Sequence, residues 1–141
     1  MNWKKESESE LRDFKKKQEA LNNIPSIIEH INFELMLFNN SINNINNNND
    51  YRWDDTVINS IIKRSELERN LLLIKHRVEL VERGLSSITF DERRILELFY
   101  IDRPIDHLQK LSEELCYEKS SVYNKKDVAI RNFTLAMYGI N

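Results

Sequence analysis

Two long apolar repeats, in which the spacing between apolar residues alternates between four and three, constrain the fold of this chain most. The first repeat consists of Ile24, Ile28, Ile31, Leu35, Phe38, Ile42 and Ile45. The second consists of Leu67, Leu71, Ile74, Val78, Val81 and Leu85. This spacing places apolar side chains along one side of an α-helix, as in a heptad seam. We therefore predict two long helices that pack lengthwise.

Glycine and proline, the residues that most often interrupt helices, occur only twice each among 141 residues. The chain is therefore predicted to be all-α. A first amphipathic helix is predicted from Trp3 to about Asn23, where Asn22, Asn23 and Pro25 should break it. Gly84 is the predicted end of the helix that carries the second repeat.

Asparagine dominates residues 43–50, between the two repeats. Because asparagine side chains compete for backbone hydrogen bonds, we predict a loop there, and a helix that begins near Thr56 behind an aspartate cap. A polar loop lets two heptad helices close into an antiparallel hairpin, although the seams could instead pair between chains as a coiled coil. We assign residues 1–84 to this assembly region and residues 85–141 to a second domain.

Residues 85–141 are predicted to form three helices. Thr89 and Glu92 have the spacing of a capping box, so the first of these helices should run from Asp91 to about Ile101. A turn at residues 102–104 leads into the next helix, whose predicted inward side chains are Ile105, Leu108, Leu111 and Leu115. The last helix should end at Gly139 and bury Val122, Ala129, Ile130, Phe133 and Met137.

A very short turn, Cys116 to Lys119, joins the last two helices, which is the sequence pattern of a helix-turn-helix. Ser121, Asn124, Lys125 and Val128 share one side of the last helix, away from its apolar residues. Serine at a helix start can bind phosphate, asparagine can bond adenine bidentately, and lysine can reach guanine or phosphate. The candidate DNA-binding residues are Lys119, Ser120, Ser121, Tyr123, Asn124, Lys125, Lys126 and Arg131.

Four motifs follow one another in the C-terminal half: DERRILELFYI, LSEEL, SSVYNKKDVAI and FTLAMYG. The span that contains them, from Phe90 to Gly139, resembles region four of bacterial sigma factors. It is still more similar to phage late-transcription regulators of the ArpU and RinA type. The resemblance implies a phage or prophage protein that reads a promoter with its last helix.

Cys116 stands where such turns usually carry glycine. If this position has a positive φ, a residue other than glycine costs on the order of 1 kcal/mol.

The net charge is −2, and the charges are unevenly distributed. Residues 116–141 hold four basic and two acidic side chains, whereas residues 85–115 hold four basic and seven acidic ones. Because neutralised phosphates supply much of the affinity for DNA, we expect moderate binding by a single copy, helped by dimerisation or by another DNA-bound protein.

Signs of catalysis and of membrane insertion are missing from the sequence. His30, His76 and His107 lie far apart, Cys116 has no evident base partner, and no glycine-rich phosphate loop occurs. We therefore expect no enzyme activity, no metal and no cofactor. The charged start lacks the apolar core of a signal peptide, and no apolar stretch approaches the roughly 20 residues of a membrane span. A cytoplasmic location without a membrane partner is expected.

We expect a transcriptional regulator that binds double-stranded DNA sequence-specifically, at a promoter or an operator. RNA polymerase is a further candidate partner, as is a second copy of the chain bound through the N-terminal helices. One alternative is a helical interaction protein, an adaptor or inhibitor of RNA polymerase or of another phage protein. Another is a DNA-packaging recognition subunit, which would assemble into a ring of many copies.

Overall fold

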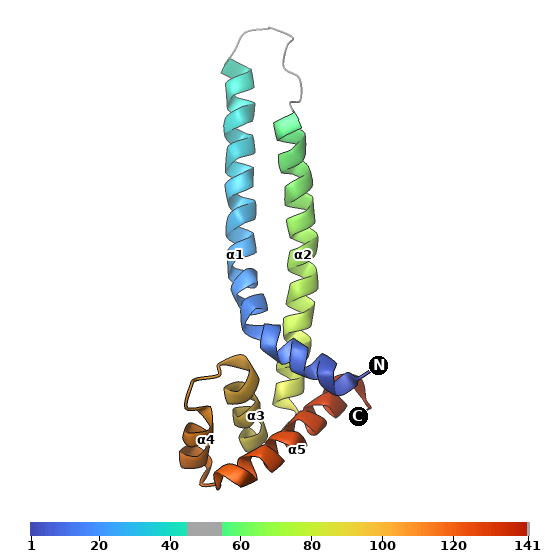
Figure 1. The fold of residues 1–141 in the computed structure, drawn as a ribbon. Helices are drawn as coiled ribbons and strands as arrows, with labels where there is room; N and C mark the ends of the chain where they lie inside the picture. Colours follow the sequence, from blue (N-terminus) through green and yellow to red (C-terminus); the bar gives the residue numbers. More distant parts are fainter. Residues whose placement is uncertain (45–54, 141) are drawn as a thin grey trace. The chain divides into compact units, whose positions relative to one another are not determined.

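The structure is a computed structural model, which describes residues 1–44 and 55–140 (Figure 1). It confirms the all-α prediction, because those residues form helices and no strand. The elements are α1 (Trp3–Asn44), α2 (Asp55–Ser86), α3 (Phe90–Leu96), the π-helical segment η1 (Glu97–Ile101), α4 (His107–Leu115) and α5 (Lys119–Tyr138).

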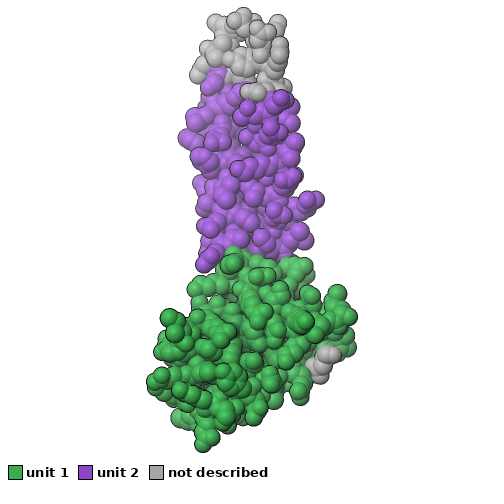
Figure 2. Space-filling view, in the orientation of Figure 1, with its two compact units in different colours: residues 1–18, 76–141 green, residues 19–75 purple. Residues whose placement is uncertain are grey.

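The chain folds into two compact units, which Figure 2 colours separately. Unit 1 consists of Met1–Gln18 and His76–Asn141, and unit 2 consists of Glu19–Lys75. The sequence-based division at residue 84 differs from this one. Residues 1–18 and 76–84, which the sequence-based division places in the assembly region, belong to the same unit as the C-terminal helices.

The predicted helix break near Pro25 is wrong. α1 runs from Trp3 to Asn44 and contains Pro25. A proline inside a helix removes one backbone hydrogen bond and disfavours the helix locally. The seam residues Ile24 and Ile31 on either side of it are buried, and their packing outweighs this local preference.

Unit 2 is the predicted hairpin, in which residues 19–44 of α1 and residues 55–75 of α2 lie side by side in opposite directions (Figure 1). Arg64 of α2 donates a hydrogen bond of 2.7 Å to Asn32 Oδ1 of α1. In the predicted asparagine-rich loop, Asn43 and Asn44 end α1, and residues 45–50 lie outside the described residues. α2 begins at Asp55, close to the predicted start.

Gly84 does not end α2, which continues to Ser86. A Cβ atom at Gly84 would lie 2.8 Å from Phe133 Cε2 and 2.8 Å from Met137 Sδ, both on α5. The glycine therefore permits α2 and α5 to approach closely within unit 1.

The predicted capping box at the start of α3 is confirmed. The Glu92 backbone N–H donates to Thr89 Oγ1 at 3.2 Å, and the Thr89 N–H donates to the Glu92 carboxylate at 3.4 Å. α3 continues as η1, which closes with a bond of 2.8 Å from the Asp102 N–H to the Glu97 carbonyl oxygen. The core that α3, η1, α4 and α5 share contains Ile95, Leu98, Phe99, Leu111 and Val122.

The predicted inward position of Ile105 is wrong, because its side chain is fully exposed. α4 begins only at His107, after a turn at Ile105 and Asp106. The His107 ring is buried instead, with its centroid 4.8 Å from that of Phe99 in an edge-to-face arrangement. The later start changes which residue reaches the core.

The first four turns of α1 complete the core of unit 1. Leu11 and Phe14 are buried, and the Trp3 ring lies 4.8 Å from the Tyr138 ring of α5. The buried Ser7 and Thr134 hydroxyl groups are hydrogen-bonded at 2.8 Å. This segment therefore packs against the buried side of α5.

Candidate nucleic-acid interface

A tight corner joins α4 to α5, as the sequence predicts. Cys116 ends α4 in the left-handed conformation, with φ 59° and ψ 35°. The Ser112 hydroxyl donates a hydrogen bond of 2.5 Å to the Tyr117 carbonyl oxygen and ties the corner to α4. Cysteine here adopts a backbone conformation that is usually taken by glycine, at a conformational cost on the order of 1 kcal/mol. The Cys116 side chain is exposed.

One side of α5 is buried and the other is exposed. Val122, Ala129, Ile130 and Phe133 are completely buried, as predicted, and Met137 is half-buried. Asn124 and Val128 are exposed on the opposite side. The tertiary packing therefore leaves the predicted recognition side open to solvent.

The structure brings together most of the candidate DNA-binding side chains. Successive residues of a helix are offset by about 100°, which follows from 3.6 residues per turn. On this count, one continuous surface of α5 holds the exposed residues Ser120, Asn124, Lys125, Val128 and Arg131 and the half-buried Ser121, and we call this surface the α5 face. Lys119 is the first residue of the helix and is also exposed.

Tyr123 and Lys126 are not part of the α5 face. The Tyr123 ring lies 6.1 Å from the Phe99 ring, edge to face. The Lys126 ammonium lies 5.3 Å from the Phe99 ring centroid and 5.8 Å from that of Tyr123. Both residues therefore turn toward η1, on the side of α5 away from Asn124.

Lys125 stands at the edge of the α5 face, over an aromatic ring of the corner. Its Nζ atom lies 4.7 Å from the Tyr117 ring centroid, within the range of a cation–π contact. The Tyr117 hydroxyl donates a hydrogen bond of 2.8 Å to Asp91 Oδ2, and this bond raises the pKa of Tyr117. The ring is thereby held in place, and it orients the lysine.

One carboxylate of α4 is paired with a cation from α3. Arg94 donates two hydrogen bonds to Glu114, at 2.8 and 2.9 Å, and a third of 3.2 Å to Glu97. The hydrogen bonds that Arg94 donates to Glu114 lower the pKa of Glu114 and raise the pKa of Arg94. The charges counted along the sequence do not show this pairing. Because Arg94 partly neutralises Glu114, α4 repels a polyanion less than that count indicates.

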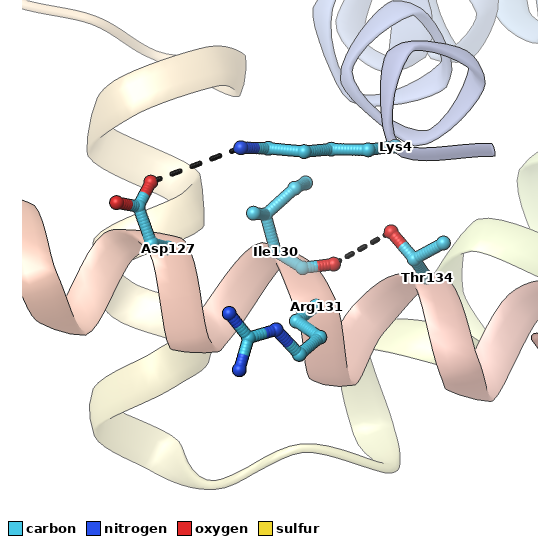
Figure 3. A pocket seen from close by; sticks show the side chains of 5 residues that line it. All are labelled: Lys4, Asp127, Ile130, Arg131 and Thr134. Atoms are coloured by element: carbon cyan, nitrogen blue, oxygen red, sulfur yellow. Dashed lines mark hydrogen bonds and ion pairs between the residues drawn. The ribbon is translucent and has the colours of Figure 1, made fainter. Parts of the chain in front are cut away.

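The only acidic residue of α5 is also paired. Lys4 of α1 extends toward Asp127 with an Nζ–Oδ1 distance of 3.9 Å, beside a hollow of about 230 Å³ (Figure 3). Arg131 lines the same hollow. The first turn of α1 thus adds a cation beside the α5 face. No local sequence pattern indicated this contribution, since it depends on how residues 1–18 pack on α5.

Compared with models of known protein families, with curated proteins and with solved structures, this chain has no match. Within residues 1–44 and 55–140, none of the helices is long and apolar enough to cross a lipid bilayer. The same residues contain no cluster of three or more histidine, cysteine, aspartate or glutamate side chains suited to a metal ion.

Proposed function

We propose that this chain binds duplex DNA in a sequence-specific manner, with α5 in the major groove. One observation carries the proposal: α5 follows a tight corner and exposes serine, asparagine and lysine on the side opposite its buried residues. A recognition helix needs this division, because one side must be held by the protein and the other must reach base edges.

Each exposed side chain of α5 has a chemistry suited to DNA. Asn124 can form two hydrogen bonds with adenine, and Lys125 can reach guanine or a phosphate. Val128, between the two on the same surface, can contact a thymine methyl group. Ser120 and Ser121 in the first turn can bind phosphate through hydroxyl and backbone N–H groups. Lys119 and Arg131 supply charge for further phosphates, and Lys4 neutralises Asp127 beside the α5 face.

The biological role that we infer is regulation of transcription at a promoter or operator, in a phage or prophage. Its support is the resemblance of the α3–α5 motifs to phage late-transcription regulators and to sigma factor region four. A contact with RNA polymerase belongs to the same proposal.

The proposal is tested by selecting bound fragments from bacterial and phage DNA and measuring their affinity by mobility shift. The combined substitutions Asn124→Ala and Lys125→Ala should weaken binding to the selected fragment at least tenfold, since one bidentate base contact contributes about 1–3 kcal/mol. Helicity by circular dichroism should stay unchanged, because both side chains are exposed.

A matched control replaces Asn59 and Lys63, which are exposed on α2 in unit 2, by alanine. It removes the same two chemical groups and should bind as the wild type does. If the Asn124/Lys125 variant also binds unchanged, the α5 face does not read DNA. If no fragment is enriched by the wild type, the proposal fails as a whole.

A helical interaction protein without DNA recognition is a second candidate. Unit 2 favours it, because Phe33, Leu72 and Leu73 are exposed there. Chromatography on duplex DNA separates the two candidates. A DNA reader is retained and elutes with a steep dependence on salt, whereas a pure interaction protein passes through.

A further inference from the structure

α2 carries a second apolar surface within unit 2, on the side away from the hairpin seam. Ile58, Ile62 and Leu73 are spaced by four and eleven residues, so they fall on one side of the helix, with Leu72 beside them. We call these four residues the outer stripe. Their exposed fractions are 42% for Ile58, 50% for Ile62, 58% for Leu73 and 70% for Leu72. A helix that is apolar on two sides is expected to be covered on both.

The size of the outer stripe matches what a dimer needs. Its exposed fractions correspond to roughly 400 Å² of apolar surface per copy, divided between Ile58 and Ile62 at one end and Leu72 and Leu73 at the other, a total at which exposed apolar surface is often functional. A standard protein interface buries about 800 Å² per partner, of which somewhat more than half is apolar. The outer stripe therefore supplies most of the apolar part of such an interface.

The charges between the two ends of the outer stripe fit a second copy of the same helix. Glu66 and Arg69 are exposed on this side of α2, between Ile62 and Leu73. When two copies of α2 pair antiparallel with Ile62 facing Leu73, Glu66 of each copy faces Arg69 of the other. A parallel pairing would place Glu66 against Glu66, and like charges repel.

We propose that the outer stripe binds a second copy of this chain through antiparallel pairing of the two α2 helices. The contact is isologous, because the same residues are used by both copies, and it closes as a dimer. It rests on unit 2 alone and does not depend on the proposed DNA binding.

The test measures the mass of the full chain, without DNA, by sedimentation equilibrium over a range of concentrations. The wild type should be a dimer. Leu73→Glu should weaken dimerisation at least a hundredfold, because it places a charge in the apolar contact. The matched control is Leu37→Glu on α1, where the side chain is 48% exposed and lies outside the outer stripe. It should dimerise as the wild type does.

A charge exchange tests the direction of the pairing. Glu66→Arg and Arg69→Glu should each weaken the dimer at least fivefold, and the two substitutions combined should restore it. The proposal is overturned by a wild type that stays monomeric, by a Leu73→Glu variant that still dimerises, or by a double exchange that fails to restore the dimer. Since no DNA is present, a failure here is distinct from a failure of the proposed DNA binding.

Discussion

Unit 1 and unit 2 bury their apolar residues to different extents. In unit 1, large side chains such as Phe133, Leu11 and Leu96 are almost completely buried between several helices. In unit 2, only Ile24, Ile31 and Val57 are buried among the described residues, although both helices have long apolar repeats. Two helices alone can cover only one side of each other. Unit 1 is therefore complete within one chain, and unit 2 is suited to a partner.

The exposed surfaces of the two units differ in the same way. The α5 face of unit 1 is mostly polar, and the acid beside it is paired with Lys4. The outer stripe of unit 2 is apolar. These surfaces suit different partners, a polar duplex in the first case and another helix in the second. One chain thus carries a candidate site for recognition and a candidate site for assembly.

Among the tests of this comparison, a matched pair of phenylalanine substitutions should show the largest change in the free energy of unfolding. Phe133 is 0% exposed and Phe33 is 52% exposed. Phe133→Ala should lower the free energy of unfolding of unit 1 by about 3–5 kcal/mol, because it leaves a cavity. Phe33→Ala should cost less than about 1 kcal/mol. Hydrogen exchange with mass spectrometry reports on each unit separately, and equal losses for the two variants would contradict the contrast in packing.

Gly84→Val should have the next largest effect. A valine side chain would clash with Phe133 and Met137, so we expect a loss of about 1–3 kcal/mol in the free energy of unfolding. The control Asn70→Val, at an exposed position of α2 in unit 2, should change it by less than about 0.5 kcal/mol. Urea unfolding measures both. A Gly84→Val protein as stable as the wild type would show that α2 and α5 do not approach as closely as the structure has them.

The smallest effect concerns alkaline pH. Burial and the neighbouring Glu8 raise the pKa of Tyr100 to about 12, above its usual value near 10. Between these values the unfolded chain has lost the phenolic proton and the folded chain still holds it, so stability falls as pH rises from 10 toward 12. The free energy of unfolding should fall less steeply in Tyr100→Phe than in the wild type. Parallel falls in the two proteins would contradict the raised pKa.

Much of the fold could be predicted because its determinants are local. The four-three spacing of the repeats gave the hairpin, and Thr89 and Glu92 gave the start of α3. Gly139 ends α5 with φ 74°, as a glycine after a helix commonly does. The predictions at Pro25, Gly84 and Ile105 were wrong because tertiary packing, rather than local sequence preference, determines the structure at these positions. Ile24 and Ile31 carry the helix past Pro25, and Gly84 serves a close contact with α5.

The candidate site could be predicted only in part, for the same reason. Helical spacing correctly placed Asn124, Lys125 and Val128 on an exposed side, whereas Ser121 is half-buried. It did not show that Tyr123 and Lys126 turn toward Phe99. The pairing of Glu114 with Arg94, and the packing of the first turns of α1 behind α5, join residues far apart in the sequence. Such contacts leave no periodic signal.

The most direct test of the central claim is a map of amide chemical shifts by NMR as duplex DNA is added to the full chain at low salt. The largest changes should lie in residues 119–131, at the positions of the α5 face, and they should shrink steeply as salt is raised. Residues 24–38 of the hairpin seam should stay unchanged. A map with no changes in α5, or with changes concentrated at another basic segment, such as the three successive lysines Lys15, Lys16 and Lys17 of α1, would contradict the proposal that α5 binds DNA.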